Sequence, residues 1–185
     1  MGIVLLVLLA LAVLVAVTYN GLARLRLLAR NAWADIDVQL KRRHDLVPTL
    51  VAAVQGHAGY EKGTLAAVVE ARNRAVAAAG PAAAGEAERT LGAAVRQLLV
   101  LAEAYPDLKA GESYLSLQRS LVEIEDHLQD ARRYYNAVVR DYNIRTAQFP
   151  SNLVAGALGF RPAEFFGLTD RSEEAPPAIE LGGPR

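Results

Sequence analysis

The sequence predicts an all-α protein: a single N-terminal transmembrane helix followed by an antiparallel bundle of three to four long helices. Three observations support this fold class. The chain opens on a long uncharged apolar run, later apolar residues recur at intervals of three and four, and no useful stretch alternates as a strand would. The composition agrees, because a chain rich in Ala and Leu with 6% aromatic residues favours helices over sheets.

The predicted transmembrane anchor comprises residues 1–23, which carry no charged side chain, and Ile3–Val17 is an unbroken apolar run. At about 1.5 Å per residue, a helix of this length covers roughly the 30 Å hydrocarbon core of a bilayer. A cleaved secretory signal is the alternative, but no basic segment precedes the run and Ala16–Thr18 is a poor cleavage site. We therefore predict a retained anchor that contacts the bilayer through residues 3–19.

The first charged residues after the anchor are Arg24, Arg26 and Arg30. Basic residues near a membrane segment collect on the cytoplasmic side, so this distribution predicts a single-pass protein with its N-terminus outside and its C-terminal domain in the cytoplasm. Tyr19 lies where aromatic residues concentrate at the membrane interface.

The chain after the anchor is predicted to form one bundle domain over residues 24–150, followed by an apolar C-terminal flap and a tail. The flap, residues 151–167, contains three phenylalanines and is expected to lie on the bundle or on the lipid surface. The tail, residues 168–185, is rich in Pro, Gly and Glu with little to bury, which predicts disorder.

The first segment of the bundle carries one apolar stripe with helical spacing. Its residues are Leu22, Leu25, Ala29, Ala32, Ile36, Leu40, Val47, Leu50 and Val54. Because nothing strongly breaks a helix between Thr18 and Ala23, the anchor and this segment are expected to form one long rod. Pro48 removes a backbone donor and predicts a kink or a local restart. Gly56 and Gly59 predict a break after the rod.

Three further helical segments are expected at Tyr60–Ala79, Glu86–Ala104 and Glu112–Ala147, with Gly80–Gly85 (GPAAAG) as a loop. The inward residues of the second helix are expected to be Leu65, Val68, Val69, Arg72 and Val76, and those of the third Leu91, Val95, Leu98, Leu99 and Ala102. The last helix has a heptad seam of Leu117, Leu121, Ile124, Leu128, Ala131, Tyr135, Val138 and Tyr142. Such a seam predicts shallow packing against a neighbouring helix.

The sequence lacks the residue patterns of common catalytic and metal sites. It has no cysteine, no Glu-x-x-His pair of a di-metal bundle, no His-Glu-x-x-His motif and no Gly-x-Ser-x-Gly elbow. Twenty basic residues balance twenty acidic ones, which argues against nucleic-acid binding. The i,i+4 pairs His57–Glu61 and Glu123–His127 are interpreted as ordinary polar pairs. We therefore predict no enzyme, no cofactor, and no catalytic, cofactor-binding or metal-ligating residue.

The densest polar cluster is Lys41–Asp45, about 30 Å beyond the anchor if the helix is continuous, which is too far for contact with lipid. Within it, Arg43 falls on the buried stripe. A buried arginine needs a charge partner on a facing helix, and the candidates are Glu61, Glu123 and Glu125.

Tyr-Asn pairs recur at Tyr19–Asn20, Tyr135–Asn136 and Tyr142–Asn143, and the last two are one heptad apart. An asparagine within a bundle can determine helix register because it requires a hydrogen-bond partner. We interpret these pairs as structural, with a ligand site as the alternative.

Several of these segments resemble the LemA family. They are residues 33–61 (WADIDVQLKRRHDLVPTLVAAVQGHAGYE), 103–110 (EAYPDLKA), 117–143 (LQRSLVEIEDHLQDARRYYNAVVRDYN) and Phe149–Pro150, together with the leading apolar segment and Tyr19–Asn20. The chain departs from the family mildly, with Thr49 where Asn is frequent. The resemblance implies a bacterial inner-membrane protein with a long-helix bundle and no established catalytic activity. It also implies a loose link to membrane-protein quality control, with an HtpX-type membrane protease as a partner.

The leading functional hypothesis is a non-enzymatic, membrane-anchored scaffold or adaptor that binds an unidentified protein. One alternative is a membrane-remodelling or self-assembling bundle, with Phe165–Phe166 of the flap touching lipid. Another is a ligand- or metal-binding helical bundle.

Overall fold

The computed structural model describes residues 1–58 and 61–167, and it is all-helical in these ranges. The helices are α1 (Gly2–Gln55), α2 (Lys62–Ala77), α3 (Pro81–Ala102), α4 (Pro106–Lys109), α5 (Glu112–Ala147) and α6 (Ser151–Ala157). The predicted fold class is confirmed. The disorder predicted for residues 168–185 falls outside the described residues.

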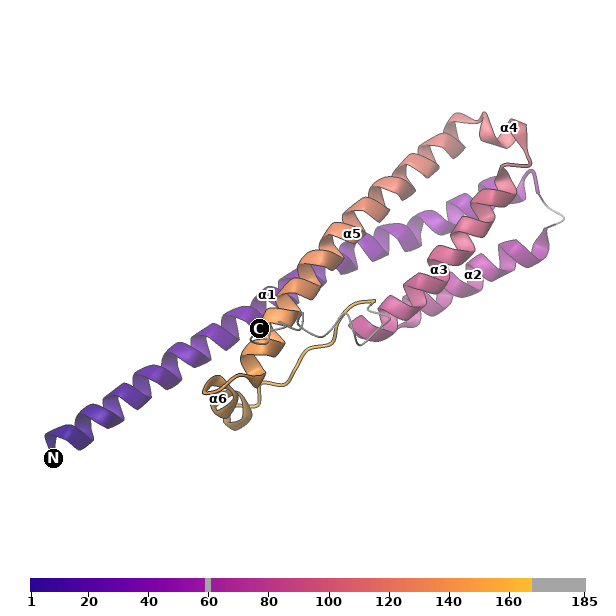
Figure 1. Ribbon diagram of the computed structural model, residues 1–185. Coiled ribbons are helices and arrows are strands. Elements are labelled where there is room, and N and C mark those ends of the chain that lie inside the picture. Colours follow the sequence, from indigo (N-terminus) through magenta and orange to yellow (C-terminus); the bar gives the residue numbers. More distant parts are fainter. Residues whose placement is uncertain (59–60, 168–185) are drawn as a thin grey trace, which may run out of the picture.

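Helix α1 is a rod along which the other helices pack (Figure 1). Helix α5 runs antiparallel along the middle of α1, and the α2–α3 hairpin packs against the end of α1 that is farther from the N-terminus. Three apolar clusters result. The distal cluster lies among α1, α2 and α3, the central one mainly between α1 and α5, and a small one around Leu22, Tyr142 and Phe160 lies nearest the apolar segment.

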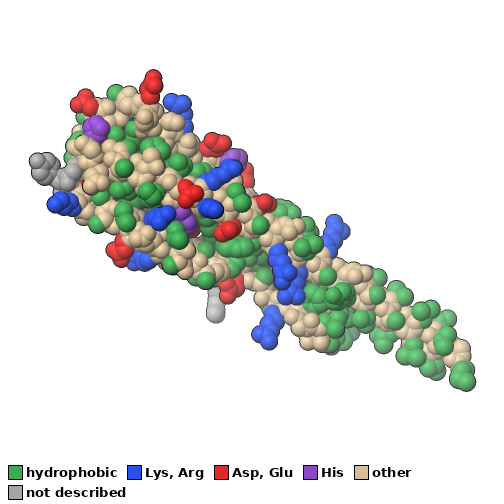
Figure 2. All heavy atoms as spheres, turned by 180° about the vertical axis from the view of Figure 1, so that it is seen from behind, with side chains coloured by type: hydrophobic (Ala, Val, Ile, Leu, Met, Phe, Trp, Pro, Cys, Tyr) green, Lys and Arg blue, Asp and Glu red, His purple; other side chains and the backbone are tan. Residues whose placement is uncertain are grey.

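The N-terminal part of α1 projects beyond the bundle with nothing packed around it (Figures 1 and 2). Within the described part of the chain, α1 is the one helix long and apolar enough to cross a membrane, judged by length and composition. Its large side chains between Ile3 and Val17 are exposed. A surface of this kind is stable in lipid and unfavourable in water, which supports membrane association.

The predicted stripe of the rod is confirmed, because eight of its nine residues are buried and Leu25 is half-buried. The local restart expected at Pro48 is wrong, since α1 is one helix from Gly2 to Gln55. Proline lacks the N–H that would bond to the carbonyl of His44, four residues earlier. Arg72 of α2 replaces that donor, with its Nε donating to the His44 carbonyl oxygen over 3.2 Å. The missing hydrogen bond of the helix is thus supplied by a neighbouring helix.

The loop predicted at Gly80–Gly85 is also wrong in extent, because α3 already begins at Pro81. Proline is favoured at the first position of a helix, and the alanines that follow are strong helix formers. Gly80 makes the turn, with a φ of 86° that other residues adopt only with strain.

In α2, the predicted inward residues Val69 and Val76 are exposed, and Ala71 and Ala75 are buried instead. Small alanines on the inner face let α2 and α3 approach closely, which turns the larger valines outward.

Helix α5 begins and ends where the sequence predicted. Five seam residues are buried, and Leu117, Leu121 and Ala131 are half-buried.

Candidate functional site

A network of charged side chains is centred on Arg43 of α1, between α3 and α5. The Arg43 Nη1 atom lies 3.3 Å from the Glu125 Oε2 atom of α5 and 3.5 Å from the Glu88 Oε2 atom of α3. His44, the next residue on α1, has its Nε2 atom 2.5 Å from Glu88 Oε1. Arg43 and Glu88 are buried, whereas the Glu125 side chain is 49% exposed. The network therefore ties three helices together from a buried centre.

The predicted charge partner of Arg43 is confirmed for Glu125, one of three candidates. Glu123 instead faces His127 on the surface of α5, at 3.8 Å, and Glu61 forms no ion pair with a described residue. The buried partner, Glu88, was missed. Its position in the apolar stripe of α3, three residues before Leu91 and on the same helix face, was a signal in the sequence.

Glycine makes room for the guanidinium of Arg43 against α3. A Cβ atom added to Gly92 would lie 3.1 Å from the Arg43 Nη2 atom, closer than side chains normally pack. Gly92 is one turn beyond Glu88, so the carboxylate and the space for its partner lie on one face of α3.

An open groove runs between α3 and α5, which make few direct contacts, with α1 at its base. Two adjoining hollows of about 310 and 910 Å³ form it, and both are lined by Arg43 and Glu125. The larger hollow has an apolar lining of Val95, Leu99, Leu115, Leu121 and Val122. Arg96, Arg119, Glu123 and Asp126 supply charges of both signs to it. We call this the α3–α5 groove.

The C-terminal segment Phe160–Gly167, here called the strap, lies along the bundle and is held by two asparagines of α5. The Asn143 amide donates to the Ala163 carbonyl at 2.9 Å and accepts from its N–H at 2.8 Å. One heptad earlier, the Asn136 amide donates to and accepts from Phe166, at 3.1 and 3.0 Å. These bonds support the structural interpretation of the two Tyr-Asn pairs of α5, because the nitrogen and the oxygen of each amide bond to the backbone of the strap.

The end of the strap is packed against the bundle core. The Phe166 ring meets Trp33 of α1 edge-to-face, with 5.6 Å between ring centroids. The backbone of Gly167 crosses α3 so closely that a Cβ on Gly85 would lie 2.3 Å from the Gly167 nitrogen. The hypothesis that Phe165–Phe166 touch lipid is therefore wrong for Phe166, which is buried in the central cluster, and Phe165 packs beside it.

Because Tyr135 is buried, the free energy of unfolding is expected to fall at alkaline pH. The Tyr135 hydroxyl donates to the Glu164 carbonyl of the strap at 2.7 Å, and burial, with the nearby Glu164 carboxylate, raises its pKa to about 12. An unfolded tyrosine ionises near pH 10, so the contribution of Tyr135 is complete below about pH 10 and is lost as pH rises toward 12, by at most about 3 kcal/mol. Burial also raises the pKa values of Tyr114 and Tyr142, which adds to the loss.

Urea unfolding followed by circular dichroism between pH 9 and 12 (about the range set by these pKa values) would measure this effect. Tyr135→Phe should make the fall in unfolding free energy visibly shallower. Tyr134→Phe is the matched control, since Tyr134 is the exposed neighbour on the same helix and should leave the pH profile unchanged. Identical profiles for the two variants would contradict the prediction.

Comparison with known proteins decides the family, because the family model of LemA matches residues 32–181. The chain belongs to the LemA family. The resemblance inferred from the sequence motifs is thereby confirmed.

Curated relatives of this LemA-family chain include magnetosome proteins named MamQ. Two from Paramagnetospirillum magneticum are each 28% identical over 159 residues, which covers 72% of this chain and 58% of theirs. A third, from Magnetospirillum gryphiswaldense, is 24% identical over 174 residues, which covers 80% of this chain and 64% of that protein. The chain thus spans less than two thirds of the length of these relatives. They support assignment of this LemA-family chain as a membrane-associated helical protein.

The described residues of this LemA-family chain contain no group of three or more His, Cys, Asp or Glu side chains placed to hold a metal ion. Among these residues, His57 and Glu61 form no hydrogen bond with each other. The Nδ1 atom of His57 lies 3.3 Å from the carbonyl oxygen of Ala53 instead. The site that the fold does build is therefore the α3–α5 groove with its ion-pair network.

Proposed function

We propose that this LemA-family chain is a non-enzymatic scaffold of the bacterial inner membrane whose α3–α5 groove binds an amphipathic helix of a protein partner. Its N-terminus lies outside and its bundle in the cytoplasm, in keeping with the arginines that follow the anchor. The observation that carries the proposal is the open groove between two helices that share α1 as a base but barely touch one another.

The lining of the groove favours a helical partner. Helices bind in grooves through an apolar stripe of residues at intervals of three and four. Leu99 and Val95 on the α3 side and Leu121 and Val122 on the α5 side provide apolar walls for such a stripe. Val122 is 62% exposed, although it is a large apolar residue in the middle of a long helix, so its burial by a partner would be favourable.

The charges around the groove favour a specific protein over a lipid. Arg96 and Arg119 lie there with Glu123 and Asp126, so the rim carries both signs. A mixed rim selects a partner by complementary charges and gives no net attraction to an anionic membrane. A membrane-protein quality-control partner, such as an HtpX-type protease, fits this proposal through the family link.

Site-specific photocrosslinking in intact membranes tests the proposal. A photoreactive residue at Val122 should crosslink to a second protein, whereas the same residue at Val76 should not. Val76 is a matched control because it is a valine of similar exposure, 53%, on α2 and outside the groove. Arg119→Glu, which reverses one rim charge, should weaken the Val122 crosslink severalfold and leave thermal unfolding unchanged.

Each outcome of this experiment is informative. Crosslinks from Val122 to a second copy of this chain would replace the adaptor proposal by self-assembly. Equal crosslinking from Val122 and Val76, or none from Val122, would overturn the assignment of the groove as a docking site.

A further inference from the structure

We propose that the membrane-proximal end of the bundle binds the headgroups of anionic phospholipids through six arginines, while α6 places its outer apolar face in the bilayer interface. The inference concerns the end of the bundle opposite α4 and does not depend on the groove. It rests on α1 crossing the membrane.

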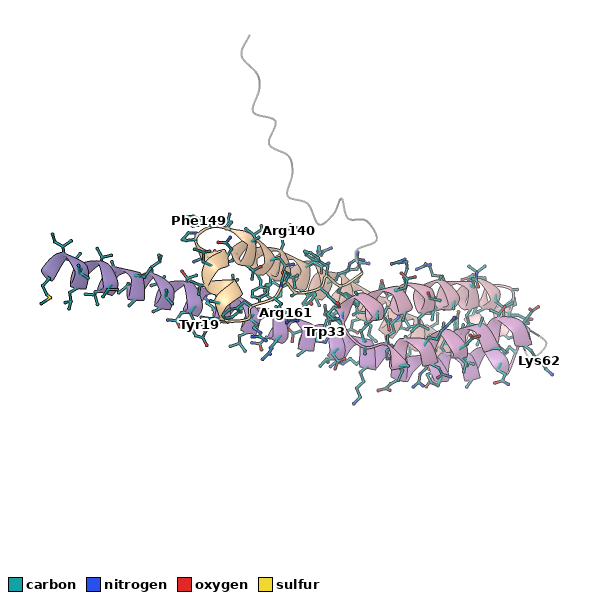
Figure 3. All side chains as sticks on the ribbon, turned by 90° about the horizontal axis from the view of Figure 1, so that it is seen from below. Tyr19, Trp33, Lys62, Arg140, Phe149 and Arg161 are labelled. Carbon is teal, nitrogen blue, oxygen red and sulfur yellow. The ribbon has the colours of Figure 1, made fainter. Side chains whose placement is uncertain are left out.

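The arginines come from three segments that only the tertiary fold brings together. They are Arg24, Arg26 and Arg30 of α1, Arg140 and Arg145 of α5, and Arg161 of the strap. Basic side chains gather where the apolar part of α1 meets the bundle (Figure 2), and Figure 3 shows Arg140 and Arg161 at this end. We call these six residues the arginine collar.

Two close approaches bring the three segments of the collar together at the base of the anchor. The Arg145 Nη2 atom lies 3.4 Å from the position of a Cβ on Gly21, so the side chain of α5 reaches across to α1. The Arg26 guanidinium carbon lies 5.9 Å from the centroid of the Phe160 ring, which precedes Arg161. The three segments therefore meet within about two helical turns of the end of the apolar run.

The collar has an excess of positive charge that the described residues do not neutralise. Residues 18–30 and 140–161 contain these six arginines and a single carboxylate, Asp141, for a formal charge of +5. All six side chains are exposed, and none lies within 4.0 Å of a carboxylate oxygen of a described residue. Elsewhere in the described bundle, four of the nine arginines have carboxylate partners: Arg43, Arg74, Arg89 and Arg133.

The apolar residues beside the collar point to a lipid surface as the source of the negative charge. Phe149, Leu153 and Leu158, in and next to α6, are 80%, 63% and 51% exposed. The other side of α6 packs on the bundle through Ser151 and Ala155. Large apolar side chains next to basic ones, on a helix packed only on one side, are typical of an interfacial membrane contact.

The arginine collar and α6 lie beside the end of the apolar run of α1, where the membrane boundary is expected. The Tyr19 ring, at the end of the apolar run, meets the Phe160 ring edge-to-face with 5.7 Å between centroids. Tyr19 and Phe149 lie at the same end of the bundle in Figure 3. A guanidinium donates two parallel hydrogen bonds to a phosphate, so arginines at this level suit phospholipid headgroups.

The first test measures whether α6 contacts the acyl chains. The chain has no cysteine, so Leu153→Cys in the full-length protein provides a unique site for an environment-sensitive fluorophore. In vesicles of phosphatidylcholine and phosphatidylglycerol, brominated acyl chains should quench this label. The same label at Val122, in the groove and far from the membrane, should not be quenched.

The second test measures lipid selectivity. The full-length protein in nanodiscs should be enriched in phosphatidylglycerol over phosphatidylcholine. Replacing Arg24, Arg145 and Arg161 together by Gln should lower this enrichment by about tenfold, since each basic residue near an anionic surface contributes appreciably to binding. Changing Arg42, Lys62 and Arg74 to Gln removes the same charge from the distal bundle, outside the groove, and should leave the enrichment unchanged. The corresponding Lys variant of the collar should retain most of it.

The outcomes separate the proposal from its alternatives. No quenching of the Leu153 label, or equal enrichment in the collar and distal variants, would overturn it. Loss of enrichment in the collar Gln variant with retention in the Lys variant, both with native circular dichroism, would confirm it. Equal loss in the Lys variant would show that packing of these side chains, and not their charge, is responsible, and would also overturn it.

Discussion

Replacing Arg43 by Met is expected to lower the free energy of unfolding by about 3 kcal/mol, because the buried Glu88 carboxylate loses the guanidinium and keeps only the bond to His44. Glu88 is 7% exposed, and its Oε2 atom has no hydrogen bond in addition to the ion pair with Arg43. Urea unfolding of the full-length protein in detergent, followed by circular dichroism, would measure the effect.

Two further variants distinguish a buried ion pair from lost packing. Arg43→Met combined with Glu88→Gln should recover more than half of the lost stability, since no charge then remains buried without a partner. Glu125→Gln should cost less than about 1 kcal/mol, because that carboxylate is half-exposed and screened by water. A double variant that is less stable than Arg43→Met would contradict the ion-pair explanation.

Gly85→Ala should destabilise the bundle by about 1–3 kcal/mol, the range for overpacking a tight contact. The new Cβ would lie 2.3 Å from the nitrogen and 2.6 Å from the Cα of Gly167, so the strap backbone must move. Displacement of the strap also strains the hydrogen bonds between Asn136 and Phe166. Hydrogen exchange of the Phe166 amide should therefore become faster, which mass spectrometry of the strap peptide would detect.

Gly63→Ala is the matched control, because it also lies in a helix but a Cβ there would meet nothing within 4 Å. Alanine is a better helix former than glycine by up to about 1 kcal/mol, so this variant should be neutral or more stable. The two substitutions are chemically identical, so a loss of stability is expected in Gly85→Ala alone. A stabilised Gly85→Ala protein with unchanged exchange at Phe166 would show that the strap is not held against α3.

Much of the fold could be predicted from residue spacing. The stripe from Leu22 to Val54 and the seam of α5 follow from apolar residues at intervals of three and four, most of which the structure buries. At Pro48, the prediction failed because a neighbouring element changed the local preference. Pro48 interrupts a helix in isolation, but Arg72 of α2 supplies the missing donor to His44.

The candidate site was predictable only in part. A buried arginine in the stripe required a carboxylate, and Glu125 was among the candidates. Glu88 lies within the apolar stripe of α3, where residue spacing alone predicts an apolar side chain. The partners of Asn136 and Asn143 could not be predicted, because each asparagine bonds to the backbone of the strap. Every residue presents the same backbone groups, so no pattern of residue types identifies which one is bound.

The sequence by itself determined the long apolar N-terminal helix, the all-helical class and the need of Arg43 for a counter-charge, because each depends on local composition or periodicity. Only the tertiary structure decided which carboxylates meet Arg43, that α3 and α5 diverge into a groove, and that six arginines from three segments gather at the base of the anchor. These features depend on distances between segments remote in the chain. Such distances are determined by how the helices pack. Residue spacing in a single sequence predicts which side chains are buried, but not which helix each of them contacts.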